Sequence, residues 1–167
     1  LGGVIVSRAI ADHFENRRLP MGLTNSGHPV GVAAGVAALQ VYQEEGLIDN
    51  ARKMGQTLQD GLQEIQAKHA SVGDVRSIGL FSTIELVKDR QTKEPLAPLP
   101  GLPSSPADAQ VAPTLSAALR ERGMHCFVKW NHLFPIPPLC ITETELRDGL
   151  QILDEVLDIA DAMMPGG

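Results

Sequence analysis

A chain of 167 residues, 43% hydrophobic and 20% charged, can bury a core of ordinary size, and we expect one domain or one domain with a piece of another. The net charge of −6 is spread without long runs of like charge, which argues against nucleic acid and against an anionic membrane surface as partners. Cys126 and Cys140 lack the spacing of a disulfide scaffold, and no stretch resembles a signal peptide or a membrane span. Composition therefore predicts a cytoplasmic protein.

The first part of the chain combines a short helix with a polar loop. Residues 6–16 have helical spacing, and the chain then turns toward residues 21–29, where hydroxyls, an amide and glycines precede a second helix at 30–45. Pro29 opens that helix, and unpaired N–H groups at such an end attract an anion such as a phosphate. The alternative is a simple cap and turn. Gly31 and Gly35 allow close approach of another backbone and predict a buried helix, which Gly46 ends.

The middle of the chain changes its period from helix to strand. Residues 49–69 predict an amphipathic helix, because apolar residues recur every three or four positions, at Ala51, Met54, Leu58, Leu62 and Ile65. Residues 72–87 alternate with the period of a strand, and we expect two short strands with a bend at 77–79. Residues 88–108 are rich in proline and predict a long surface loop.

The last part of the chain returns to helices. Residues 111–122 predict a helix with Leu115, Ala118 and Leu119 inward, and residues 124–129 predict a strand. Thr142 caps a final helix, Glu145 completes its capping box, and an apolar stripe follows at Leu146, Leu150, Leu153 and Leu157. Residues 163–167 form a tail. A few strands covered by helices predict an α/β fold with an antiparallel or mixed sheet.

Three runs of residues, in this order and spacing, carry a resemblance to a known family. They are Leu1-Gly2-Gly3-Val4, then Thr24-x-Ser26-Gly27-His28-Pro29-Val30, then Pro137-Pro138-Leu139 with Ile141-Thr142. Together they resemble the C-terminal part of a class III pyridoxal-phosphate-dependent aminotransferase, and the resemblance covers essentially the whole chain.

The resemblance implies a fold type I transferase shared between two domains. Residues 1–29 correspond to the tail of the large cofactor-binding domain, residues 30–46 to an interdomain helix, and residues 47–167 to the small C-terminal α/β domain. In the family, the threonine of the Thr-x-Ser-Gly-His-Pro motif binds the cofactor phosphate of the neighbouring subunit. The implied phosphate ligand is Thr24, assisted by backbone groups near Leu23 and Asn25, in a homodimer whose active site lies across the subunits.

The family's Schiff-base lysine precedes the Leu-Gly-Gly-Val run, so the resemblance places it upstream of Leu1. We assign no catalytic role to the lysines of this chain, which are Lys53, Lys68, Lys88, Lys93 and Lys129. Because the first residue is leucine rather than methionine, we expect an incomplete chain that is inactive by itself.

Lys129 stands where family members commonly place an arginine that holds the substrate carboxylate. A lysine supplies the charge but lacks the planar, two-pronged geometry of a guanidinium. Lys129 is therefore the candidate substrate-binding residue, and the alternative is a solvated lysine at a strand end. We expect Trp130, beside Phe127 and Phe134, to pack in the core.

The other polar residues receive structural interpretations. His28 is expected to fix its loop, Arg76 to form an ion pair, and the acidic residues of the last helix, Asp154 among them, to form a solvated face. The remaining histidines lack metal-ligand spacing, so no metal site is expected.

The function implied by the resemblance is transfer of an amino group from an amine or amino acid to a 2-oxo acid through pyridoxal phosphate. Two alternatives stay open. The first is that the chain is a noncatalytic α/β dimerisation or binding module. The second is that it belongs to a mutase or decarboxylase of the same fold.

Overall fold

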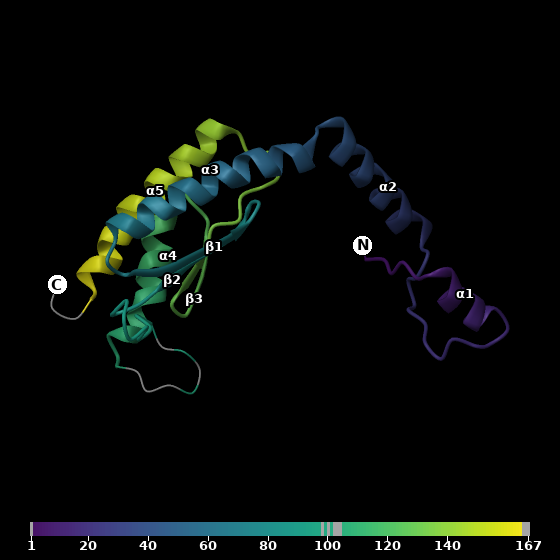
Figure 1. Ribbon diagram of the computed structural model, residues 1–167, viewed down its shortest axis with the longest axis horizontal. Coiled ribbons are helices and arrows are strands. Elements are labelled where there is room, and N and C mark those ends of the chain that lie inside the picture. Colours follow the sequence, from purple (N-terminus) through teal and green to yellow (C-terminus); the bar gives the residue numbers. More distant parts are fainter. Residues whose placement is uncertain (1, 98, 100, 102–104, 165–167) are drawn as a thin grey trace. The chain divides into compact units, whose positions relative to one another are not determined.

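The computed structural model describes residues 2–97, 99, 101 and 105–164. The chain divides into two units, Leu1–Gly46 and Leu47–Gly167 (Figure 1). Their boundary coincides with the predicted start of the small domain, whereas the assignment of the first unit to a large domain stays a prediction. Some residues used in the predictions lie outside the described residues. They are Leu1 of the first motif, Pro98, Pro100 and Pro103 of the predicted loop, and Pro165–Gly167 of the tail.

The first unit holds two helices, as predicted, but lacks a core among its described residues. These helices are α1 (Arg8–Glu15), whose N-cap Ser7 accepts a hydrogen bond from the Ile10 N–H, and α2 (Pro29–Glu44). The prediction that α2 is buried is wrong for this chain, because Val30 is 71% exposed and Leu39 is 67% exposed. A segment of this size cannot enclose a helix that is apolar on nearly all sides.

The second unit is built on one four-stranded antiparallel sheet in the order β1-β2-β4-β3. Its strands are β1 (Val72–Ile78), β2 (Phe81–Leu86), β3 (Phe127–Lys129) and β4 (His132–Phe134). The turn between β1 and β2 passes through Gly79 at φ +55°, a backbone conformation that glycine adopts without strain. The predicted antiparallel arrangement is confirmed, but β4 was not predicted because a three-residue strand carries too little alternation to recognise.

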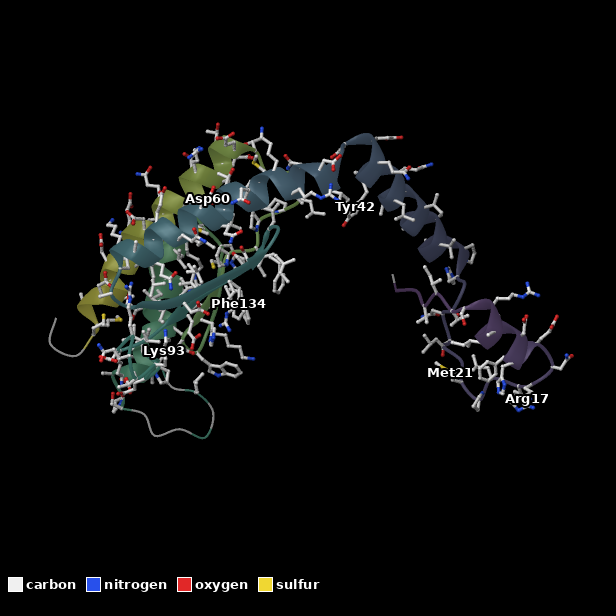
Figure 2. All side chains as sticks on the ribbon, viewed as in Figure 1. Arg17, Met21, Tyr42, Asp60, Lys93 and Phe134 are labelled. Atoms are coloured by element: carbon white, nitrogen blue, oxygen red, sulfur yellow. The ribbon has the colours of Figure 1, made fainter. Side chains whose placement is uncertain are left out.

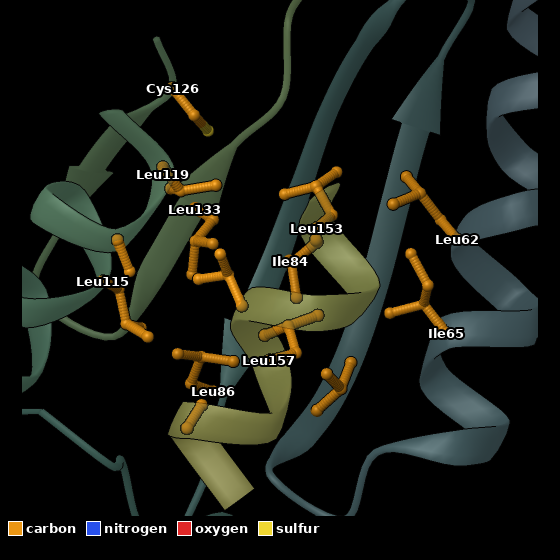
Figure 3. Packing of buried hydrophobic residues seen from close by; sticks show 14 of the residues in the cluster. Leu62, Ile65, Ile84, Leu86, Leu115, Leu119, Cys126, Leu133, Leu153 and Leu157 are labelled. Carbon is orange, nitrogen blue, oxygen red and sulfur yellow. The ribbon is translucent and has the colours of Figure 1, made fainter. Parts of the chain in front are cut away.

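Three helices share one core with the sheet. They are α3 (Leu47–Lys68), α4 (Val111–Glu121), which a 3-10 turn at Asp108–Gln110 precedes, and α5 (Glu143–Ala162). Figure 3 shows Leu62 and Ile65 of α3, Leu153 and Leu157 of α5, and Leu115 and Leu119 of α4 gathered around Ile84, Leu86 and Leu133 of the sheet. The predicted inner stripes of the helices are confirmed, except that Ala51 and Leu150 are only half-buried. Within the described ranges, none of the helices is long and apolar enough to cross a membrane.

Candidate functional site

The loop before α2 presents Leu23, Thr24 and Asn25 in one exposed turn. The Ser26 N–H donates to the Leu23 carbonyl at 3.0 Å, and the His28 N–H donates to the Asn25 carbonyl at 3.3 Å. These two bonds close the turn and leave the Thr24 side chain on its exposed outer side. An exposed hydroxyl just ahead of a helix N-terminus fits a phosphate group.

His28 fixes this turn through its backbone. It is the N-cap of α2, its side chain makes no capping hydrogen bond, and its carbonyl accepts from the Val32 N–H at 3.0 Å. Pro29 follows at the first helical position, as predicted. The geometry of the loop therefore comes from main-chain bonds rather than from the imidazole.

One face of the sheet in the second unit points away from the core. Three ring side chains, those of Phe127, His132 and Phe134, lie together on it. Phe127 pairs with Phe134 across β3 and β4, with ring centroids 5.6 Å apart, and His132 stacks on Phe134 at 6.0 Å. Cross-strand partners point to the same side of a sheet, so these rings share one face (Figure 2 labels Phe134). Phe127 is 58% exposed. This face is open to a ligand or to another surface.

Lys129 ends β3 beside this aromatic group. Its Nζ lies 4.4 Å from the ring centroid of Trp130, within the range of a cation–π contact. Trp130 is 42% exposed, so the prediction that it packs in the core is wrong. Trp130 stands in the two-residue turn between β3 and β4, where Asn131 takes the buried position and the Trp130 ring lies against the Lys129 side chain. The Lys129 ammonium is thus accessible and also restrained.

Arg76 confirms its predicted ion-pair role. Its guanidinium lies 3.3 Å from Asp74 and 3.2 Å from Glu85, on strands β1 and β2. All three side chains are partly exposed, and such pairs contribute little to stability because water and salt screen them.

A buried histidine joins the end of α3 to α5. His69 has no exposed surface, its Nδ1 lies 2.8 Å from Asp161 and its Nε2 lies 2.9 Å from Asp154. The Ser71 N–H also donates to Asp161 at 2.8 Å, and Lys68 holds Asp154 at 2.5 Å. Asp154 is therefore a structural partner rather than part of a solvated face.

Sequence reasoning missed this cluster, although one signal was present. Asp154, Asp158 and Asp161 recur at helical spacing on one side of α5. Three acidic residues on one side of a helix indicate that positively charged or donor groups pack against that side. Ligand atoms of His69, Asp158 and Asp161 lie within 4.8 Å of one another, a separation that a metal ion could bridge. The hydrogen bonds to both ring nitrogens account for the arrangement without an ion.

The partners of these carboxylates also set their acidity. Burial opposes ionisation of Asp154, but hydrogen bonds from Lys68 and His69 outweigh it and lower the pKa of Asp154. In the same way, burial opposes ionisation of Asp161, and hydrogen bonds from Ser71 and His69 lower its pKa. Cys126 shows the opposite effect, because burial raises the pKa of its thiol to about 11.

A family model described as aminotransferase class-III matches residues 1–157. The chain belongs to the class III aminotransferases. Two curated relatives show how much of such proteins it represents. It is 32% identical over 143 residues to 4-aminobutyrate aminotransferase of Escherichia coli, a match that covers 84% of this chain and 31% of that protein. It is 34% identical over 144 residues to ethanolamine-phosphate phospho-lyase homolog 1 of Caenorhabditis elegans, covering 81% of this chain and 27% of that protein.

Solved structures of class III aminotransferases share the fold. The taurine:2-oxoglutarate aminotransferase of Bifidobacterium kashiwanohense, solved in complex with PLP and glutamate, has a TM-score of 0.84 and is 38% identical, covering 94% of this chain and 34% of that chain. This match confirms the expected transferase fold and pyridoxal phosphate as the cofactor. The chain spans about a third of the length of these relatives.

Proposed function

We propose that the whole protein moves an amino group from an amine or amino acid that carries an acidic group to a 2-oxo acid. Family membership supports aminotransferase chemistry. The observation that carries the donor class is the accessible Lys129 ammonium on the open sheet face, which can attract a carboxylate or sulfonate. The names of relatives are consistent with this class, since 4-aminobutyrate and taurine both combine an amine with an acidic group.

Thr24 is the proposed ligand of the cofactor phosphate. Its hydroxyl would donate to a phosphate oxygen, backbone groups at Leu23 and Asn25 would assist, and α2 would add the positive end of its dipole. The resemblance assigns this contact to the cofactor of the neighbouring subunit, so we propose a homodimer. Bound pyridoxal phosphate supplies an electron sink for the amino-group transfer.

The phosphate contact is tested by exchanging the hydroxyl. In the full-length protein, Thr24→Ala is expected to raise the dissociation constant of pyridoxal phosphate by about ten- to a hundredfold, as loss of a hydrogen bond to a charged group predicts. Thr24→Ser keeps the hydroxyl and serves as the matched control. Equal affinities of the two variants would exclude Thr24 as a phosphate ligand.

The donor class is tested by a panel of amines with the full-length protein and a 2-oxo acid. Donors with a terminal carboxylate or sulfonate should react with a lower KM than alkylamines of the same length. Lys129→Ala should abolish that preference, whereas Lys129→Arg should retain it, because the charge remains. A preference that survives Lys129→Ala would contradict the proposal.

One relative supports a second candidate reaction. The Caenorhabditis elegans protein is named a phospho-lyase homolog, so a matching sequence in this region does not by itself fix the reaction. Product analysis separates the candidates. An amino acid formed from the 2-oxo acid indicates transamination, release of ammonia or carbon dioxide indicates a lyase or decarboxylase, and a rearranged amine indicates a mutase. No turnover at all indicates a noncatalytic module.

A further inference from the structure

Trp130 adopts an unusual backbone conformation. It has φ 57° in the turn between Lys129 and His132, a region that large side chains enter at a cost in free energy. Glycine or asparagine is the usual occupant of such a position. A tryptophan stays there only when the surrounding structure holds it.

Asn131 is the residue that holds it. Its side chain is 1% exposed, and its Nδ2 donates to the Leu86 carbonyl at 3.0 Å. Its own carbonyl accepts from the Leu86 N–H at 2.7 Å. Asn131 therefore binds both backbone groups of Leu86, a fully buried residue at the end of β2, and attaches the turn to the core of the sheet.

The side-chain amide of Asn131 carries a cost in folding free energy. The Oδ1 atom of Asn131 is buried and has no hydrogen-bond partner among the described residues. An unpaired buried acceptor normally destabilises a fold, so its presence calls for an explanation. The turn that Asn131 attaches to the sheet presents the Trp130 ring, against which the Lys129 ammonium rests.

We propose that Asn131 is a positioning residue that sets the location of the Lys129 ammonium. By fixing the turn, it keeps Trp130 in its left-handed conformation, and the ring in turn restrains the flexible lysine side chain. Lysine is a mobile point charge, and the ring replaces part of the directionality that an arginine would have. This inference rests on the proposed role of Lys129 in binding the acidic group of the donor.

The experiment compares three variants in the full-length protein. Asn131→Ala removes the side-chain hydrogen bond to the Leu86 carbonyl and keeps the backbone bond from the Leu86 N–H. Trp130→Gly removes the ring while keeping a residue that accepts φ 57°, and Ser82→Ala is the matched control. Ser82 is also buried, and its hydroxyl donates to the Pro135 carbonyl at 2.5 Å, beyond the other end of β4. It does not touch the turn. The readouts are the KM of a donor with an acidic group, the KM of an alkylamine of the same length, and the melting temperature.

Asn131→Ala and Trp130→Gly are each expected to raise the KM of the acidic donor by about three- to tenfold, in the range of a cation–π contact, and to leave that of the alkylamine unchanged. Ser82→Ala should lower the melting temperature without altering either KM. A parallel rise in both KM values for Asn131→Ala and Trp130→Gly would overturn the inference, because it would mark a general structural loss.

Lys129→Ala separates this inference from the function on which it rests. If Lys129→Ala raises the KM of the acidic donor but Asn131→Ala and Trp130→Gly do not, the positioning role is wrong and the donor class stands. If Lys129→Ala has no effect, both the donor-binding role of Lys129 and the positioning role of Asn131 are wrong.

Discussion

Gly55 of α3 lies so close to Gly79 that a Cβ atom on Gly55 would be 2.6 Å from the Gly79 Cα. No side-chain carbon fits at that distance, and the obstructing atoms belong to the backbone. The contact sets how closely α3 approaches the turn between β1 and β2. The position of the helix on the sheet therefore depends on the absence of a methyl group.

Gly55→Ala should destabilise the protein by about 1–3 kcal/mol, the usual cost of an overpacked contact. Gly149 of α5 is the matched control, because nothing lies within 4 Å of a Cβ built there. Gly149→Ala should stabilise by about 0.5–1 kcal/mol, since alanine favours a helix interior over glycine. Urea unfolding of both variants checks the pair, and equal shifts of the same sign would contradict the close approach.

His69→Gln should lower the free energy of unfolding by about 1.5–3 kcal/mol, because at least one hydrogen bond to a charged carboxylate is lost. The control is Asp158→Asn. Asp158 lies 3.8 Å from the ring and its side chain is 66% exposed, so its loss should change stability by less than about 0.5 kcal/mol. Denaturant titration distinguishes the two variants. A large effect of Asp158→Asn would instead indicate that the three acidic residues act together on the ring.

The cluster also predicts a dependence of stability on pH. Burial opposes ionisation of Asp154 and Asp161, but hydrogen bonds lower the pKa of both carboxyls, from Lys68 and then His69 for Asp154 and from Ser71 and then His69 for Asp161. Stabilisation from a carboxylate of lowered pKa is complete above its unfolded value of about 3.9 and is lost as pH falls through the folded value. The stability difference between wild type and His69→Gln should therefore shrink below about pH 4. Unfolding titrations across this range test it, and a constant difference would contradict the assignment.

Thr142→Ala should cost about 1 kcal/mol through loss of the N-cap of α5. The Thr142 hydroxyl accepts from the Glu145 N–H at 3.3 Å, and the Glu145 carboxylate accepts from the Thr142 N–H at 2.9 Å. Thr142→Ser keeps the cap and should change stability little. Thermal unfolding measures both, and an equal loss in the two variants would show that the methyl group rather than the hydroxyl matters.

Cys126 should resist alkylation under native conditions. Burial raises the pKa of its thiol to about 11, so almost none is present as the reactive thiolate at neutral pH. Peptide mass spectrometry after iodoacetamide treatment should find Cys126 unmodified until denaturant is added. Rapid native labelling of Cys126 would show that the region around α4 and β3 opens locally.

Long periodic elements were predictable from the sequence because many residues repeat one signal. The inward stripe of α3 and the capping box of α5 needed only spacing and a cap, and both are confirmed. The burial of α2 could not be predicted from the helix itself, because burial depends on what covers it. The three residues of β4 carry too little pattern to be recognised, since strand pairing is a property of two distant segments.

The candidate site shows the same division. The turn around Thr24 could be located from its motif, since its glycines, proline and polar residues are local signals. The partners of His69 could not be predicted from the sequence, because Asp154 and Asp161 are 85 and 92 residues away along the chain. The prediction that Trp130 packs in the core rested on its aromatic neighbours Phe127 and Phe134, whereas the structure has this residue 42% exposed in the turn before β4.

The left-handed backbone conformation of Trp130 has a consequence for laboratory evolution of this protein. Substitutions there that raise thermal stability would also lower selectivity. Glycine or asparagine suits φ 57° better than tryptophan does, so a screen for thermostable variants would enrich replacements at this position. Such variants would survive heating while losing the ring that restrains Lys129. Activity and stability often trade off at strained positions. If Lys129 binds the acidic group of the donor as we propose, a library selected on heating alone would lose the preference for charged amines.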